Sequence, residues 1–291
     1  MRTSESDAPF AVVPATAGRG VVAGLSATWW ECGPPEGRPV VLVHGGGVDE
    51  ARLSWGTLIG PLAAAGHRVV APDLPGYGES EGFDRSHTVA DLAGFLVAFC
   101  ELLALERPAF CGISMGGATV LAAALRQPGL PRAVVAVAPY GLLATSPHPH
   151  LFWLAARVPV HRAAFALIAA SERAAIRSTV RLYEDPARID ADLIPQVRRS
   201  ARRQAKRPAF ADFARGELTR SGFHTDLSPR LGEIAAPVTL VHGEGDPLVP
   251  ISASDRAARA SGVPLERMPG GHLLTRERSD EVFEVIGRAI A

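Results

Sequence analysis

The sequence GISMGG, residues 112–117, is the stretch that decides the fold of this 291-residue chain. It lies between a short apolar run, Pro108–Cys111, which predicts a buried strand, and the segment Met115–Arg126, whose apolar residues recur at helical spacing. Small residues on both sides of Ser114 permit a tight strand-to-helix turn that lifts the serine hydroxyl into the open. The amides that begin the next helix would face the place where an oxyanion develops. Taken by itself, the segment could also be a glycine-rich turn without a chemical role.

Short apolar runs, each followed by a loop of glycine, proline or acidic residues, recur along the chain and alternate with longer amphipathic stretches. Parallel strands covered by helices on both faces produce this pattern, so it predicts an α/β fold with a doubly wound, mostly parallel sheet. The predicted strands are Val40–Val43, Arg68–Ala71, Pro108–Cys111, Ala133–Ala138, Val238–Val241 and Leu265–Met268. The predicted helices are Leu53–Ala65, Val89–Leu105, Met115–Arg126, Ser252–Ala260 and Ser279–Ile290, and the segment Gly20–Cys32 alternates like antiparallel edge strands.

The alternation stops between about Tyr140 and Asp226, where the sequence is helical, rich in arginine and interrupted by prolines. Strand-and-loop segments flank this stretch on both sides, which favours an insertion over a second domain that follows the first. We therefore predict one discontinuous core, residues 1–139 and 227–291, and a helical cap at residues 140–226.

A serine hydroxyl becomes a strong nucleophile only when a base takes its proton and an acid orients that base. The loop Gly243–Asp246 follows a predicted strand and places Asp246 at the same edge of the sheet as Ser114. His272 follows two glycines in the loop after the last predicted strand. The chain order Ser114, Asp246, His272 is the order that a nucleophile, acid and base take in this architecture. The alternatives are a turn-capping carboxylate for Asp246 and an exposed loop histidine for His272.

The run His44–Gly47 follows the predicted strand Val40–Val43, and its three glycines let backbone N–H groups approach a substrate oxygen. One of these N–H groups would join the amide of Met115 in an oxyanion hole. We expect His44 itself to be structural. A nucleotide-binding loop is rejected, because neither a Gly-Lys-Ser/Thr nor a spaced G-x-G-x-x-G with its acidic partner follows the glycines.

From about Gly20 onward the chain resembles the capped α/β-hydrolase superfamily. The matching segments, in the order and spacing of that superfamily, are His44–Gly47, Pro72–Ser80, Gly112–Gly117, Gly243–Pro250 and Gly270–His272. The resemblance implies that Ser114 is the nucleophile, Asp246 the acid and His272 the base, and that the amides of Gly46 and Met115 form the oxyanion hole. It also implies that Asp73 supports loop structure rather than chemistry.

Within the superfamily, the triple glycine and the sequence Ser-Met-Gly-Gly-Ala-Thr are similar to hydrolases that cleave carbon–carbon bonds in ring-fission products of aromatic compounds. Those enzymes tend to carry Asn where this chain has Ile113 and Trp where it has Leu273. Both departures remove polar or aromatic substrate contacts. We therefore expect hydrolysis of a small carboxylic ester or lactone through an acyl-enzyme on Ser114, with carbon–carbon hydrolysis as the alternative.

The predicted cap carries two features that could meet a substrate. Its basic residues recur in adjacent pairs on one helix face: Arg198, Arg199, Arg202, Arg203, Lys206 and Arg207. This face is either solvated or attracts an anionic substrate. Trp153 lies in an apolar cluster with Leu151 and Phe152, which either lines the acyl pocket or packs the cap. Trp153, Tyr140 and Leu273 are the candidate substrate contacts.

The composition bounds the remaining possibilities. Charged residues make up 21% of the chain, the formal net charge is zero and Lys206 is the only lysine, which indicates no nucleic-acid partner. Three cysteines in neither a CxxC nor a Cys/His spacing predict no disulfide framework and no metal, and a triad needs no cofactor. Met1–Phe10 does not resemble a secretory signal, and the apolar runs are too short to span a bilayer. We expect a cytoplasmic protein, monomeric or homodimeric, that acts on a small molecule without membrane contact.

Two other classes of function are compatible with this sequence. A small-molecule receptor could keep the triad and use the pocket for ligand-triggered partner binding. A non-hydrolytic biosynthetic catalyst, such as a lyase or cyclase, could use the same fold, because fold does not determine chemistry.

Overall fold

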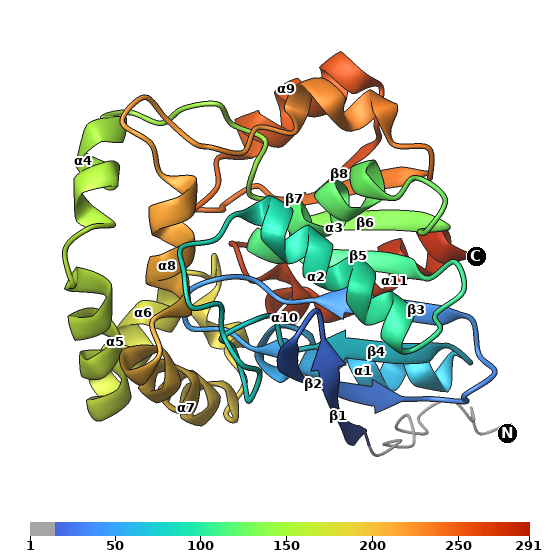
Figure 1. Ribbon diagram of the computed structural model, residues 1–291, viewed down its shortest axis with the longest axis horizontal. Helices are drawn as coiled ribbons and strands as arrows, with labels where there is room; N and C mark the ends of the chain where they lie inside the picture. Colours follow the sequence, from blue (N-terminus) through green and yellow to red (C-terminus); the bar gives the residue numbers. More distant parts are fainter. Residues whose placement is uncertain (1–14) are drawn as a thin grey trace, which may run out of the picture.

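A mostly parallel sheet of eight strands forms the centre of the computed structural model, which describes residues 15–291 (Figure 1). The segment Met1–Phe10, which does not resemble a secretory signal, lies outside the described residues. In spatial order the strands are β1 (Thr16–Val22), β2 (Leu25–Cys32), β4 (Arg68–Pro72), β3 (Pro39–Val43), β5 (Ala109–Ile113), β6 (Ala133–Val137), β7 (Val238–Gly243) and β8 (Leu265–Met268). Strand β2 is antiparallel to both β1 and β4, and all other neighbours are parallel. The α/β fold with a doubly wound, mostly parallel sheet is confirmed.

Two layers of helices cover the sheet, which explains why its central strands are apolar at every position. Every residue of β5 and of β6 is buried, because side chains on both faces of a central parallel strand meet helices. Helices α2 (Val89–Leu102), α3 (Met115–Arg126) and α9 (Ile251–Ser261) bury their apolar faces in one core cluster. Helices α1 (Ala51–Ala64) and α11 (Ser279–Ile290) contribute to the other cluster, together with the short helix α10 (Leu274–Glu277).

The predicted elements appear with bounds shifted by a few residues. The edge strands begin at Thr16 rather than Gly20, and the largest shift among the helices is in α2, which ends at Leu102 rather than Leu105. Ala104 adopts a left-handed backbone conformation with φ of 47°, and this conformation cannot continue a right-handed helix.

The segment predicted as a cap holds helices and no strand of the central sheet. It contains α4 (Pro149–Ala155), α5 (Val160–Ala170), α6 (Glu172–Val180), the short helix η1 (Pro186–Arg188), α7 (Leu193–Lys206) and α8 (Ala209–Glu217), followed by η2 (Ser228–Glu233) before β7. Figure 1 shows α4 to α8 gathered at one side of the sheet. We refer to residues 140–226 as the cap segment.

Candidate active site

Ser114 occupies a sharp turn between β5 and α3. Its backbone has φ of 54° and ψ of −118°, an unfavourable conformation for a residue with a side chain. In this turn the backbone passes so close to neighbouring backbone atoms that two positions have no room for a side chain. A Cβ atom on Gly116 would lie 2.2 Å from the carbonyl oxygen of Val43, and one on Gly112 would lie 2.3 Å from that of Gly116. The glycines of the 112–117 sequence therefore allow the turn that places the half-buried Ser114 at the cavity.

Asp246 lies in the loop after β7 and its side chain is fully buried. Its Oδ1 accepts hydrogen bonds from the amides of Leu248 and Val249, at 2.8 and 3.0 Å, and its Oδ2 lies 2.7 Å from His272 Nδ1. Burial alone would raise the pKa of Asp246, but hydrogen bonds from His242 and His272 and the backbone amide of Val249 lower it well below its usual value. The group is therefore an ionised carboxylate.

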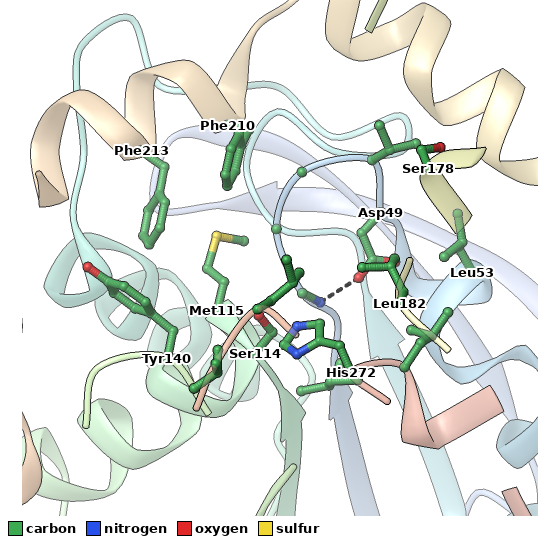
Figure 2. Close-up of a pocket in the computed structure, with 18 of the residues that line it drawn as sticks. Asp49, Leu53, Ser114, Met115, Tyr140, Ser178, Leu182, Phe210, Phe213 and His272 are labelled. Atoms are coloured by element: carbon green, nitrogen blue, oxygen red, sulfur yellow. Dashed lines mark hydrogen bonds between the residues drawn. The ribbon is translucent and has the colours of Figure 1, made fainter. Parts of the chain in front are cut away.

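His272 stands between Asp246 and the cavity that Ser114 lines. An ionised carboxylate can only accept hydrogen bonds, so the proton of the imidazole resides on Nδ1 and Nε2 is left as an acceptor. His272 and Ser114 line the same cavity, and Figure 2 shows the imidazole beside the serine. The structure thus brings Ser114, Asp246 and His272, which are far apart in the sequence, to one place.

His242, the penultimate residue of β7, supports the acid from the other side. Its Nε2 lies 2.9 Å from the carbonyl oxygen of Val249 and 3.3 Å from Asp246 Oδ2, and both of these are acceptors, so Nε2 carries a proton. Its Nδ1 then accepts from the hydroxyl of Ser254, at 2.8 Å. Sequence reasoning missed His242, although its place just before the Gly243–Asp246 loop was a usable signal.

The loop that carries His272 is tied to the cap segment. The amide of His272 donates to the carbonyl oxygen of Leu182, at 2.7 Å. The buried carboxylate of Glu277, from α10, accepts the amides of Gly271, Glu184 and Asp185 at 2.8 to 3.3 Å. Sequence reasoning missed Glu277, because a single acidic residue in a helix does not reveal that it accepts the amides of Glu184 and Asp185, which are more than ninety positions away.

The glycine loop after β3 lies against the nucleophile turn. Gly46 and Met115, the predicted oxyanion donors, both line the cavity next to Ser114, and a Cβ atom on Gly46 would lie 3.4 Å from Met115 Sδ. His44 accepts a hydrogen bond from the amide of Leu74 at Nε2, at 2.9 Å, and donates from Nδ1 to the carbonyl oxygen of Gly45, at 2.7 Å. With both ring nitrogens bound to backbone, His44 is placed as a structural residue.

Asp49 closes this loop, and sequence reasoning did not single it out. Its carboxylate accepts from the amide of Gly45 at 2.7 Å, from the hydroxyl of Ser54 at 2.6 Å and from the amide of Glu50 at 2.8 Å (Figure 2 shows the Gly45 contact). Burial raises the pKa of Asp49 against the effect of these bonds and of His44. Asp49 therefore holds the backbone on both sides of Gly46.

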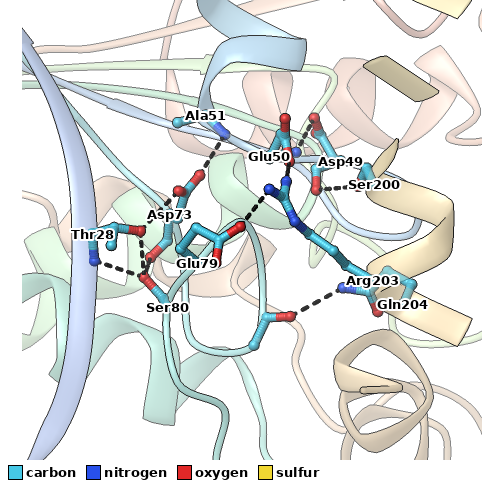
Figure 3. Close-up of polar contacts among 11 residues, drawn as sticks. Thr28, Asp49, Glu50, Ala51, Asp73, Glu79, Ser80, Ser200, Arg203 and Gln204 are labelled. Atoms are coloured by element: carbon cyan, nitrogen blue, oxygen red, sulfur yellow. Dashed lines mark hydrogen bonds and ion pairs between the residues drawn. The ribbon is translucent and has the colours of Figure 1, made fainter. Parts of the chain in front are cut away.

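Helix α7 of the cap segment docks on the same loop (Figure 3). The hydroxyl of Ser200 donates to the backbone oxygen of Asp49, at 2.9 Å, and Arg203 forms ion pairs with Glu50 and Glu79. Within the Arg-rich face, Arg203 thus contacts the core, and none of the six basic residues lines the cavity beside Ser114. The alternative that this face attracts an anionic substrate gains no support from the lining of the cavity.

Asp73 also supports loop structure. Its carboxylate accepts from the amide of Ala51, at 3.0 Å, and from the hydroxyl of Thr28, at 3.0 Å, while Ser80 donates to its carbonyl oxygen (Figure 3). These bonds join β2, the loop after β4 and the first turn of α1. Asp73 does not line the cavity beside Ser114.

The cavity beside Ser114 has a volume of about 400 Å³ and a largely apolar wall. Tyr140 and Leu273, two of the three predicted substrate contacts, line it, as does Ile113. The apolar and aromatic lining includes Leu53, Phe165, Ile168, Leu182, Val197, Phe210, Phe213, Leu218, Leu248 and Val249. No Lys or Arg occurs among the described residues that line it.

Trp153, the third predicted contact, does not line the cavity. Its indole ring lies between two guanidinium groups, with Arg157 and Arg220 at 4.3 and 4.5 Å from the ring centroid. The neighbouring Leu151 and Phe152 are exposed, so the cluster faces solvent rather than the pocket.

Tyr140 is fixed by a buried carboxylate at the end of α8. Its hydroxyl donates to Glu217 at 3.0 Å, and Glu217 also accepts from the amide of Val89 and from the amide and hydroxyl of Thr225. Burial, and then the charge of Glu217, raise the pKa of Tyr140 far above its usual value. Tyr140 therefore presents its ring, and no ionisable acid, to the cavity.

Within residues 15–291, no group of three or more His, Cys, Asp or Glu side chains could hold a metal ion. The arrangement of a serine on a strained turn, a histidine, a buried carboxylate and backbone donors is one that can carry out acyl transfer.

Residues 40–285, most of the chain, match the family described as the alpha/beta hydrolase family. The chain belongs to this family. Similar proteins include 2-hydroxy-6-oxo-6-phenylhexa-2,4-dienoate hydrolase of Burkholderia cepacia, 28% identical over 74% of each chain. The magnesium-chelatase 30 kDa subunit of Rhodobacter capsulatus is 31% identical over 89% of each chain. The dihydrolipoyllysine-residue acetyltransferase component of the acetoin cleaving system of Pseudomonas putida is 28% identical, and the match spans 65% of that longer protein.

Two solved structures illustrate the likeness of the fold. A serine hydrolase involved in carbazole degradation superposes with a TM-score of 0.78 at 21% identity, over 95% of this chain and 99% of that one. The enol-lactonase of Burkholderia xenovorans LB400 superposes with a TM-score of 0.76 at 20% identity, over 94% of this chain and 99% of that one. Family membership supports hydrolase activity, and relatives this diverse do not fix the bond that is cleaved.

Proposed function

We propose that this protein is a serine hydrolase that cleaves small, uncharged carboxylic esters or lactones through an acyl-enzyme on Ser114. The observation that carries the proposal is the contact of 2.7 Å between His272 Nδ1 and the buried, ionised Asp246, in the cavity that Ser114 lines. This contact leaves Nε2 of His272 free to accept a proton, as a general base must.

In the proposed reaction the hydroxyl of Ser114 attacks the substrate carbonyl while His272 Nε2 takes its proton. The amides of Gly46 and Met115 stabilise the oxyanion, and His272 then returns the proton to the leaving alcohol. Water, activated by the same histidine, attacks the acyl-enzyme and releases the acid. Asp246 keeps the imidazole in the tautomer that both steps require.

The wall of the cavity supports an uncharged substrate. A carboxylate removed from water needs a cationic partner, and no Lys or Arg lines the cavity, whereas Asp49 and Glu217 do. The similarity to an enol-lactonase in fold is compatible with a lactone as one such substrate.

Carbon–carbon hydrolysis is the second candidate, because the similar protein of Burkholderia cepacia is named as a hydrolase of a phenylhexadienoate. Ile113 and Leu273 both line the cavity as apolar groups, and an anionic dienoate would find no Lys or Arg there. We therefore place it below ester and lactone hydrolysis.

The test is turnover of p-nitrophenyl acetate and butyrate, short lactones and a ring-fission dienoate by the protein and by Ser114→Ala. We expect steady turnover of the neutral esters or lactones, and loss of activity in Ser114→Ala by a factor on the order of 10⁴ or more. Preferred turnover of the dienoate would select the second candidate. A single slow turnover would favour a receptor, and product without oxygen from labelled water would favour a non-hydrolytic catalyst.

A further inference from the structure

Helix α4 is an apolar helix that buries none of its side chains. Its sequence is PHLFWLA, yet Leu151, Phe152 and Leu154 are 54%, 50% and 53% exposed. Three more large apolar side chains follow at the turn and along α5: Val158, Val160 and Leu167. We call these six residues the α4–α5 surface. An apolar helix without a buried face needs a partner outside the fold, because leaving it in water costs free energy.

The cavity lies behind this surface. Phe165 and Ile168 of α5 line the cavity, whereas Leu167 of the same helix is 61% exposed. One helix therefore separates the exposed apolar side chains from the space beside Ser114. Among residues 15–291 no single helix is long and apolar enough to cross a membrane; α4 and α5 pass that test only as a pair, bent by 66°.

Along the sequence, the segment that carries this surface has charged side chains of one sign. Between Arg107 and Ser171 the sequence holds no Asp or Glu, while Arg157 and Arg162 lie within α4–α5 and its connecting turn. Neither arginine, nor Arg220, forms an ion pair with an acidic side chain of the described residues. The ring of Trp153 lies between Arg157 and Arg220.

We propose that the α4–α5 surface binds the surface of an anionic lipid bilayer. Exposed Leu and Phe side chains, Trp at the polar boundary and unpaired arginines are the composition that places a helix in a lipid interface. A second copy of this chain fits less well, because a two-fold dimer would set this cationic face against itself. The expectation of no membrane contact considered only spanning segments, whereas this contact is peripheral.

The experiment is co-sedimentation of the full chain with vesicles of phosphatidylcholine alone and of equal parts phosphatidylcholine and phosphatidylglycerol, at low and high salt. We expect binding to the anionic vesicles that weakens at high salt. Phe152→Asp combined with Leu154→Asp should weaken that binding at least about tenfold, because two apolar contacts are replaced by carboxylates that the anionic lipid head groups repel. Val21→Asp is the matched control, since Val21 is 65% exposed on β1 at the far edge of the sheet.

Circular dichroism and turnover of a soluble ester report on the fold, and both should be unchanged in the double variant, since neither residue lines the cavity. The proposal is overturned by absence of binding to anionic vesicles, or by equal loss in Val21→Asp. It is also overturned if light scattering shows a dimer that only the double variant dissociates, because the surface then binds a second copy. Vesicle binding can be present without ester turnover, so this result is independent of the proposed function.

Discussion

Asp246→Asn is the substitution whose outcome the structure specifies most closely. Oδ1 of Asp246 accepts two backbone amides, Leu248 and Val249, while Oδ2 accepts the Nδ1 proton of His272. Asparagine has one oxygen and one NH₂ group. If its oxygen stays with the two amides, the NH₂ group faces Nδ1 of His272 and favours the tautomer with the proton on Nε2.

That tautomer cannot accept a proton from Ser114. The flipped rotamer restores the histidine contact, but it sets the NH₂ group against two amide donors in a fully buried position, at a cost of about 1–3 kcal/mol for each unsatisfied group. The inactive arrangement therefore dominates. We expect kcat to fall by about 10³ to 10⁴, which corresponds to about 4 to 5.5 kcal/mol of barrier.

The assay is steady-state turnover of p-nitrophenyl butyrate by wild type, Asp246→Asn and two control variants, with circular dichroism to check the fold. Glu244→Gln changes an exposed residue of the same loop, and Asp226→Asn changes a carboxylate that accepts from Ser228 at 3.0 and 2.6 Å. Both controls should stay within about tenfold of wild type. Near-normal activity of Asp246→Asn, with either control inactive, would refute the assignment of the acid.

Four further outcomes follow from the geometry. A fluorophosphonate should add once, to Ser114; mapping to another serine would contradict the proposed nucleophile. Ser200→Ala removes one hydrogen bond of about 1 kcal/mol to the loop of Gly46, so kcat/KM should fall about fivefold while the melting temperature falls by only about 2–4 °C. An unchanged kcat/KM would show that the contact of α7 does not affect the site. Partial burial alone would raise the pKa of Asp91, but the Arg85 guanidinium and Thr88 lower it to about 2. The stabilisation is therefore complete above pH of about 4 and is lost as the pH falls through about 2. Because Arg85 is exposed and solvent screens the pair, Asp91→Asn should lower the free energy of unfolding by about 1 kcal/mol at pH 7 and flatten this acid dependence in denaturant titrations. Burial raises the pKa of the Cys111 thiol to about 12, so it should resist a thiol reagent at pH 8 until the protein unfolds, and rapid labelling of the native protein would contradict its burial.

The parts of the site that the sequence predicts are those that stand directly after a strand. Ser114, Asp246 and His272 follow β5, β7 and β8, and parallel strands bring their carboxyl ends to one edge, so strand and loop patterns were sufficient to group them. Local glycine motifs marked the same positions. The fold class follows from the same pattern, because continuous apolar runs require helices on both faces of the sheet.

The parts that the sequence does not predict depend on contacts across long stretches of chain. Ser200 reaches Asp49 across 151 positions, and Glu277 reaches Glu184 across 93. No local pattern encodes such a pair. Burial in the cap segment also does not follow from the sequence pattern. The apolar residues around Trp153 predict a buried helix face, but α4 exposes these side chains to solvent.

The contact between α7 and the glycine loop links access to the site with its ability to react. Ser200 and Arg203 contact Asp49 and Glu50, and Asp49 in turn accepts the amide of Gly45, next to the proposed oxyanion donor Gly46. A displacement of α7 wide enough to admit a substrate would release these bonds and loosen the donor that the transition state needs. If the proposed acyl-enzyme forms, bulk water that entered during such an opening would meet a loosened donor, and deacylation would then require α7 to contact the loop again. The contact of α7 with the loop would thereby couple the exclusion of solvent to the assembly of the proposed oxyanion hole.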